Sequence, residues 1–177
     1  IPNEHTIIGE MLRGAGYNTF HTGKWHNGKD SFNRSFSQDN DIFFGGMYDH
    51  WNVPLFSYDT SGEYKDKRKV IKNAWANNEV EILEGEYVKS GIHSVDIFTD
   101  TAIEFINDQA NEQTPFFLSL CYMSPHDPRS MPEEYMQLYN SKDIELPSNY
   151  MKQHPFDNGE MRIRDEVLAA IPRIDNE

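Results

Sequence analysis

The chain has 177 residues, with 16 lysines and arginines against 29 aspartates and glutamates, for a net charge of −13. This acidic balance argues against non-specific nucleic-acid binding, which depends on clustered cations that face phosphates. No apolar stretch approaches 18 residues, so a membrane span is not expected, and a single cysteine, Cys121, excludes a disulfide within the chain. Mean hydropathy is −0.74, yet aromatic residues make up 13% of the chain. We therefore expect a folded, loop-rich domain.

The chain begins with a predicted helix and strand. Thr6 is expected to cap a helix whose apolar residues share one face, namely Ile7, Ile8, Met11 and Leu12. Gly14 and Gly16 are expected to end this helix. Residues 17–22 are rich in Tyr, Thr and Phe and predict a strand. Residues 41–44, followed by two glycines, predict a second short strand.

The middle of the chain is expected to be irregular over residues 48–92, with hairpin-like signals at 60–62 and 84–86. Ser94 then predicts the start of a second helix, whose apolar stripe is Val95, Phe98, Ala102, Phe105 and Ile106. Residues 115–123 form an apolar run of strand length, which is typical of a strand buried on both faces of a parallel sheet. This order of helix and strand predicts an α/β layered fold with a mixed, mostly parallel sheet and flanking helices. A short helix over 132–139 and another around 165–170 are expected in a tail that is mostly loop.

Two segments follow predicted strands and carry chemically useful side chains. The first is Gly-Lys-Trp-His-Asn-Gly at residues 23–28, and loops past the carboxyl ends of parallel strands are where ligands usually bind. Lys24 and His26 are two residues apart, so they point the same way on an extended backbone. The second is Ser-Pro-His-Asp-Pro at residues 124–128, where prolines on both sides restrict the backbone around His126. A cation and an imidazole on the same side could form an anion site, while spacing alone leaves a surface lysine and structural histidines as the alternative interpretation.

These motifs in this order resemble the type I sulfatases of the alkaline-phosphatase-like superfamily. The resemblance is carried by Met-Leu-Arg-Gly-Ala-Gly-Tyr at residues 11–17, which leads into Gly-Lys-Trp-His, and by Pro-Phe-Phe-Leu at 115–118, which leads into Pro-His-Asp-Pro. It covers most of the chain and is weakest over residues 48–92. The resemblance implies a large α/β domain that hydrolyses sulfate esters, with carbohydrate sulfate as the expected substrate class, a formylglycine nucleophile and a calcium ion.

The resemblance also implies roles for three residues. Lys24 matches the family lysine that contacts formylglycine and sulfate, and His26 matches the histidine beside the formylglycine that acts as a base. His126 matches the histidine near the ester oxygen, which donates to the sulfate or the leaving group. The catalytic set expected here is therefore Lys24, His26 and His126, with Lys24 and His126 also binding substrate.

Other parts of the family pattern are missing. Cys121 is followed by Tyr-Met-Ser-Pro, which does not fit the nucleophile motif Cys/Ser-x-Pro/Ala-x-Arg, and neither the paired aspartates nor the later Asp-Asn block that hold calcium is matched. We therefore expect residues 1–177 to be an internal fragment of one catalytic domain that is inactive alone, binds no complete metal site and could self-associate through uncovered strands. A periplasmic or secreted location is expected for the complete family member.

Several alternatives remain open. A phosphodiesterase or phosphonate hydrolase of the same superfamily, or a non-catalytic binding module with this fold, would share these features. The cationic run Lys65, Lys67, Arg68, Lys69 and Lys72 is expected to be a solvated face, with guidance of a sulfated glycan as the alternative. His50 and Trp51 could stack on a sugar, or could pack beneath the site loop.

Overall fold

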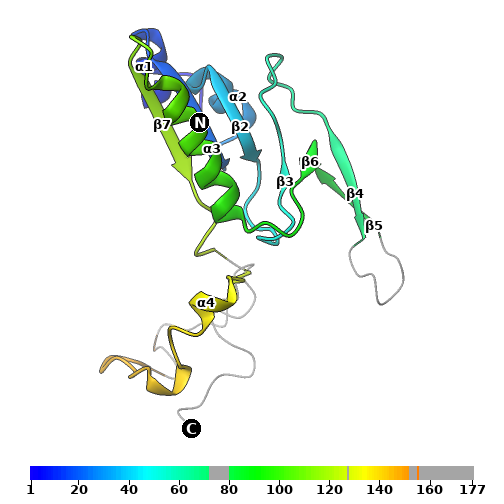
Figure 1. The fold of residues 1–177 in the computed structure, drawn as a ribbon, viewed down its shortest axis with the longest axis vertical. Coiled ribbons are helices and arrows are strands. Elements are labelled where there is room, and N and C mark those ends of the chain that lie inside the picture. The colour runs from blue at the N-terminus through cyan, green and yellow to red at the C-terminus, as the bar shows by residue number, and fades with distance from the viewer. Residues whose placement is uncertain (72–79, 127, 152–154, 156–177) are drawn as a thin grey trace. The chain divides into compact units, whose positions relative to one another are not determined.

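The computed structural model describes residues 1–71, 80–126, 128–151 and 155. The chain divides into two compact units, Ile1–Met131 and Pro132–Glu177. The first unit holds a parallel sheet with helices on both faces (Figure 1). The α/β layered fold expected from the sequence is confirmed. No helix among the described residues combines the length and apolar character needed to cross a bilayer.

The main sheet has three strands in the order β2-β1-β7, and every pairing within it is parallel. Its strands are β1 (Asn18–Lys24), β2 (Gln38–Phe43) and β7 (Phe116–Cys121). All three were expected, although β1 extends to Lys24 and β2 begins at Gln38, earlier than predicted. Because the strands are parallel, their carboxyl ends meet at one edge of the sheet.

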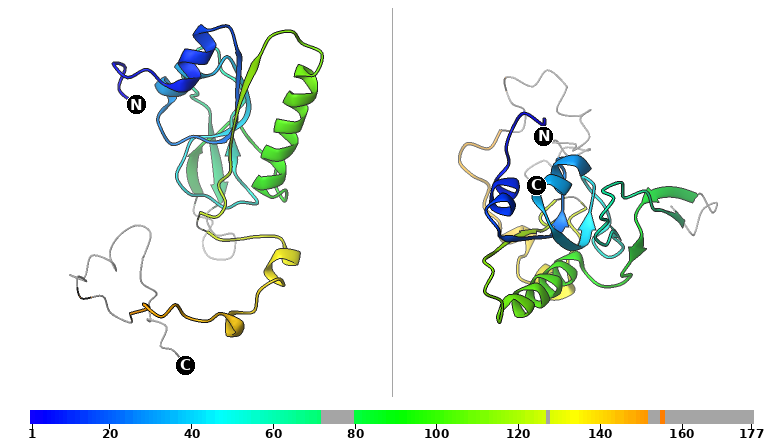
Figure 2. Two further views of the ribbon diagram at one scale, coloured as in Figure 1. Left: turned by 90° about the vertical axis from the view of Figure 1, so that its left-hand side faces the viewer. Right: turned by 90° about the horizontal axis from the view of Figure 1, so that it is seen from above.

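Helices cover both faces of this sheet (Figure 2). The helices α1 (Ile8–Gly14) and α2 (Lys29–Ser35) pack against one face, and α3 (Ser94–Gln109) packs against the other. One cluster of buried residues lies on the α2 side, formed by Phe32, Phe36, Ile42, Phe56 and Tyr64. A second lies on the α3 side, formed by Phe43, Val53, Leu55, Ile97, Phe98 and Met123.

Two details of α1 differ from the prediction. The residue that precedes the helix is Ile7 rather than Thr6, and no side chain caps the first turn. Ile8 is 66% exposed and Met11 is 62% exposed. The buried contact is made instead by Gly9, where a Cβ atom would lie 2.7 Å from the Cβ of Ser35. The apolar pattern was therefore misleading because this helix packs through its backbone.

Helix α2 was not predicted, and its buried face explains why. Ser31, Phe32 and Ser35 are its buried residues, so apolar periodicity is nearly absent. The serine hydroxyls are accommodated by bonds to the helix backbone, from Ser31 to the carbonyl oxygen of Asn27 (2.7 Å) and from Ser35 to that of Ser31 (2.8 Å). Such local bonds allow polar residues to line a buried helix face.

Helix α3 was predicted at the right place but with the wrong cap. His93 is the N-cap residue, and its Nδ1 accepts a hydrogen bond from the Val95 amide at 3.3 Å. Ile106 is 45% exposed, whereas Phe98, Ala102 and Phe105 are buried as expected.

Strand β7 is less buried than its apolar sequence predicts. Phe116 is 42% exposed, and the other five residues of the strand are of intermediate burial. Among the described residues β7 pairs with β1 alone, which leaves its other edge uncovered. The expectation of a strand buried on both faces is therefore wrong for this chain as described.

The segment between β2 and α3 contains short strands where irregular structure was expected. Strand β3 (Pro54–Leu55) pairs with β6 (Tyr87–Val88), and β4 (Lys67–Ile71) pairs with β5 (Val80–Glu84), both antiparallel. Residues 84–86 do not form a hairpin turn, because the strands on either side pair with different partners.

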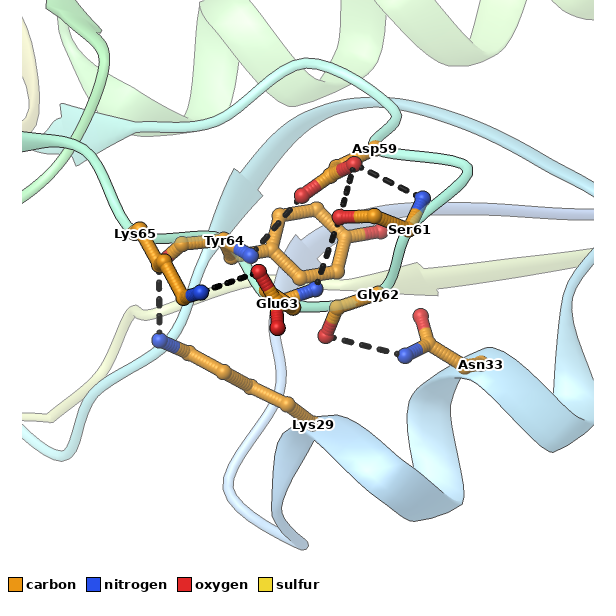
Figure 3. Close-up of polar contacts among 8 residues, drawn as sticks. All are labelled: Lys29, Asn33, Asp59, Ser61, Gly62, Glu63, Tyr64 and Lys65. Carbon is orange, nitrogen blue, oxygen red and sulfur yellow. Dashed lines mark hydrogen bonds and ion pairs between the residues drawn. The ribbon is translucent and has the colours of Figure 1, made fainter.

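The turn at residues 59–64, within this segment, packs against α2 (Figure 3). The Asp59 carboxylate accepts from the amides of Ser61 (2.8 Å) and Tyr64 (2.9 Å). Lys29 donates to the Tyr64 carbonyl oxygen at 2.9 Å, and Asn33 donates to the Gly62 carbonyl oxygen at 3.1 Å. Gly62 has a φ of +75° and leaves no room for a Cβ beside the Asn33 amide. The turn is thus held against α2 by polar contacts.

The second unit contains the helix α4 (Glu133–Met136) and the 3-10 helix η1 (Ser141–Asp143). The predicted helix over residues 132–139 is confirmed in position, although it is shorter. The helix expected around residues 165–170 lies outside the described residues.

Candidate active site

The Gly-Lys-Trp-His segment leaves the sheet at the end of β1. Gly23 is the parallel partner of Cys121 in β7 and has a φ of +104°. A Cβ atom at Gly23 would clash with the Cys121 carbonyl group, so glycine is required for the two strands to approach here. One residue past the strand, the Trp25 amide donates to the Phe43 carbonyl oxygen at 2.9 Å, which continues the pairing with β2. The segment therefore leaves the sheet in a defined direction.

Lys24 and His26 lie at this carboxyl edge. Lys24 is the last residue of β1 and is half-buried, whereas His26 is exposed. The His26 ring lies against Gly46, since a Cβ atom at Gly46 would be 3.4 Å from its Cε1. The loop after β2 thus contacts the segment after β1.

His126 lies past the end of β7, the strand next to β1. Its amide donates to the Met123 carbonyl oxygen at 2.9 Å, and its side chain is half-buried. Because Gly23 and Cys121 are partners in parallel strands, the segments that carry Lys24 and His126 leave the same edge of the sheet. The predicted placement at one edge is confirmed by this pairing, whereas the catalytic roles of the three residues remain predictions.

His50 packs beneath the loop that carries His126. Its side chain is 1% exposed, so it cannot stack on a sugar. Its Nε2 lies 3.2 Å from the His126 carbonyl oxygen, and its Nδ1 lies 3.0 Å from Ser94 Oγ. Burial lowers the pKa of His50, opposed by the hydrogen bond to the His126 backbone. The ring is therefore held in its neutral form near neutral pH. This packing is one of the two alternatives that the sequence leaves open for His50.

His93 lies beside His50 and was not singled out by the sequence. The two rings are stacked at 5.3 Å with an interplanar angle of 10°, and Trp51 contacts His93 edge-on at 5.0 Å. His93 Nε2 lies 3.1 Å from the Ser130 carbonyl oxygen. Its position one residue before a predicted helix was the signal that could have identified it as a cap.

The cationic run contributes to the β4 strand rather than to the carboxyl edge. Lys67, Arg68 and Lys69 are part of β4. Lys65 pairs with Glu63 and its side chain is 74% exposed, and Lys72 lies outside the described residues. A solvated face is the interpretation that the exposed Lys65 supports.

A pocket of about 410 Å³ lies at the opposite end of the sheet from these motifs. It is lined by residues at the starts of β1 and β2, including Asn18 and Gln38, and by α3 residues that include Glu104, Asp108 and Glu112. Its three carboxylates make it unsuited to a sulfate group. The carboxyl edge of the sheet, rather than this pocket, is therefore the candidate active site.

The described residues do not fit a calcium ion or a formylglycine. No three His, Cys, Asp or Glu side chains among them gather in a way that could hold a metal, whereas calcium takes six or more oxygens. Cys121 lies within β7, with its Sγ 3.7 Å from Ser119 Oγ, and is not in a loop at the edge.

The structure defines the class of protein as an α/β domain whose parallel sheet has a lysine and two histidines at or just past its carboxyl edge. The sequence model of the Sulfatase family matches residues 1–176. The chain belongs to the sulfatase family.

Proteins named as sulfatases are similar in sequence to this chain. The chain is 25% identical over 144 residues to the uncharacterized sulfatase YidJ of Escherichia coli (strain K12), a match that spans 80% of this chain and 27% of that protein. It is 26% identical over 151 residues to the ulvan-active sulfatase of Formosa agariphila, across 84% of this chain and 26% of that protein. The chain thus spans about a quarter of the length of these relatives.

A solved structure supports the fold. The crystal structure of Ps i-CgsB in complex with k-i-k-neocarrahexaose is similar with a TM-score of 0.53 and 23% sequence identity, over 80% of this chain and 32% of that chain. At this identity the likeness concerns the fold alone.

Proposed function

We propose that this chain is a segment of a sulfatase catalytic domain that hydrolyses sulfate esters, and that it supplies Lys24, His26 and His126 to the active site. The observation that carries the proposal is the parallel pairing of Gly23 in β1 with Cys121 in β7. This pairing brings the two motifs that resemble sulfatase signatures to one edge of the sheet. The family match along residues 1–176 supports it.

The three side chains suit the chemistry of sulfate-ester cleavage. Negative charge collects on the sulfate oxygens during cleavage, and the Lys24 ammonium group supplies positive charge at that point. A local cation matters here because the chain has a net charge of −13, which repels an anionic substrate elsewhere. His126 donates a proton to the departing oxygen, whose alkoxide form is a poor leaving group. His26 acts as a base at the same edge.

Family resemblance supplies the rest of this proposal. A formylglycine nucleophile and a calcium ion are expected in the complete enzyme, and the described residues hold neither. We therefore propose that residues 1–177 alone do not hydrolyse sulfate esters. In this proposal the fragment belongs to one catalytic domain whose nucleophile and metal blocks lie elsewhere in the protein.

The substrate class is proposed to be carbohydrate sulfate. Support comes from the relative that is named as ulvan-active and is 26% identical to this chain. A phosphodiesterase or phosphonate hydrolase of the same superfamily is the second candidate, because Lys24 and His126 would also suit a phosphate ester.

A substrate panel on a full-length protein that contains this chain tests the proposal. Sulfated oligosaccharides, an aryl sulfate and a phosphate diester are incubated separately, and released sulfate or phosphate ester product is measured. Sulfate release in preference to phosphodiester cleavage is expected. Cleavage of the diester alone would favour the second candidate, and no turnover of any ester would favour a binding module.

A further inference from the structure

Two stacked histidines contact the backbone of the loop that follows β7. His50 comes from the segment between β2 and β3, and His93 from the N-cap of α3. They are 1% and 4% exposed, and their rings stack at 5.3 Å. His50 reaches the carbonyl oxygen of His126, and His93 reaches that of Ser130. The two contacts lie on either side of residue 127, which is outside the described residues.

Hydrogen bonding fixes the proton on each ring. A carbonyl oxygen can only accept, so Nε2 of His50 must donate to His126. Nδ1 of His50 is then the acceptor in a neutral ring, and the Ser94 hydroxyl at 3.0 Å donates to it. In His93 the Val95 amide donates to Nδ1, which leaves Nε2 to donate to Ser130 at 3.1 Å. Both rings are therefore oriented by contacts with the first turn of α3.

This arrangement links a rigid helix to the backbone of the candidate catalytic histidine. Ser94 is fully buried at the start of α3, and its hydroxyl orients the His50 ring. The His126 amide is also bound, to the Met123 carbonyl oxygen at 2.9 Å. The main chain of His126 is thus held at both its amide and its carbonyl group. A side chain on a backbone held in this way loses less orientational freedom when it binds substrate.

We propose that His50 is a positioning residue for His126, and that His93 is the second anchor of the same loop. The inference rests on the proposed function in one respect, namely that His126 donates a proton to the leaving group. His50 itself is buried and does not touch the substrate. Its effect on the reaction is therefore exerted through the direction in which the His126 imidazole points.

This role has a signature that a general loss of stability lacks. Proton donation matters most when the leaving group is a poor one, such as the alkoxide of a sugar, and least when it is an acidic phenol. A displaced His126 should therefore impair the hydrolysis of a sugar sulfate far more than that of 4-nitrophenyl sulfate. A partly unfolded enzyme would lose both activities in the same proportion.

Three substitutions in the full-length protein separate the contacts. His50→Leu removes the donor to His126, whereas His50→Gln keeps an amide N–H near the former Nε2 position. His93→Asn keeps an acceptor for the Val95 amide, because asparagine is a good N-cap residue, but it is too short to reach the Ser130 carbonyl group. Turnover of both sulfate esters is measured for each variant, and exchange of the His126 amide is followed by NMR.

His50→Leu is expected to lower kcat on the sugar sulfate by about 10- to 100-fold and to lower that on 4-nitrophenyl sulfate much less. His50→Gln should restore most of the loss, and His93→Asn should give a smaller loss of the same selective kind. Equal losses on both esters, or none, would overturn the positioning role.

Exchange of the His126 amide tests the anchor without any substrate. It should be faster in His50→Leu than in the wild type and close to wild-type values in His50→Gln. Unchanged exchange in His50→Leu would overturn the inference. If the wild-type protein hydrolysed no sulfate ester, the proposed function would fail, and amide exchange would still decide whether His50 anchors this loop.

Discussion

Gly23 and Cys121 are direct partners in the parallel pairing of β1 with β7, and Gly23 leaves no space for a Cβ atom beside the Cys121 carbonyl group. This close approach lies one residue before Lys24 and five residues before His126. The geometry of the candidate site therefore depends on a glycine that has no functional group of its own.

Gly23→Ala should destabilise the protein strongly. The φ of +104° is unfavourable for alanine and costs roughly 1–3 kcal/mol, and the clash with the Cys121 backbone adds about 1–3 kcal/mol more. Gly16→Ala is the matched control, since Gly16 also has a positive φ of +89° but has nothing within 4 Å of the added Cβ. Urea unfolding of the two full-length variants should show the larger loss at Gly23. Equal losses would mean that the strand approach is not restrictive.

His21 should make stability depend on acid pH. Burial lowers the pKa of His21 to about 4, partly opposed by a hydrogen bond with the Gly23 backbone, from an ordinary value of 6.5. The unfolded chain therefore binds more protons between these values, so the contribution of His21 is fully present above about pH 6.5 and is lost as pH falls toward 4. The loss amounts to at most about 3 kcal/mol.

His21→Leu tests this dependence, because leucine cannot titrate. The free energy of unfolding of the full-length protein is measured at pH 7 and pH 5 for both forms. The wild type should lose more stability on acidification than the variant. Parallel losses would show that the His21 ring is protonated in the folded protein.

Asp39, the partner of His21 in the β1–β2 pairing, should act in the opposite direction. Burial is the largest cause that raises the pKa of Asp39 to about 8, partly offset by a hydrogen bond from Tyr64 and reinforced by Asp59. The unfolded chain ionises from about pH 4, whereas the folded carboxyl group stays protonated. Stability associated with Asp39 is therefore fully present below about pH 4 and is lost as pH rises toward 8.

Asp39→Asn should remove this alkaline loss, since an amide stays neutral and can still accept from the Tyr64 hydroxyl group. Thermal unfolding from pH 5 to pH 8 should show a growing advantage of the variant over the wild type. A constant difference across this range would contradict a protonated Asp39.

Sequence reasoning located the motifs well because their strands are short apolar or β-branched runs that end in Gly-Lys-Trp-His and Ser-Pro-His. It missed α2 because two of that helix's three buried residues are serines, whose burial depends on local hydrogen bonds rather than apolar periodicity. The partial exposure of β7 could not be predicted either, because an apolar run does not show which strands and helices lie beside it. The contact between His50 and His126 joins residues 76 positions apart, and no local pattern predicts it.

Lys24 and His126 are proposed to belong to the active site of a sulfatase. The most direct measurement is kcat for a sulfated oligosaccharide with the full-length wild type, Lys24→Ala, His126→Ala and the control Lys65→Ala, whose side chain is 74% exposed. Each of the first two substitutions should lower kcat by roughly 10²- to 10⁴-fold with unchanged thermal unfolding, while Lys65→Ala retains wild-type turnover. Wild-type turnover in the Lys24 or His126 variant would contradict the proposed placement of that residue in the active site.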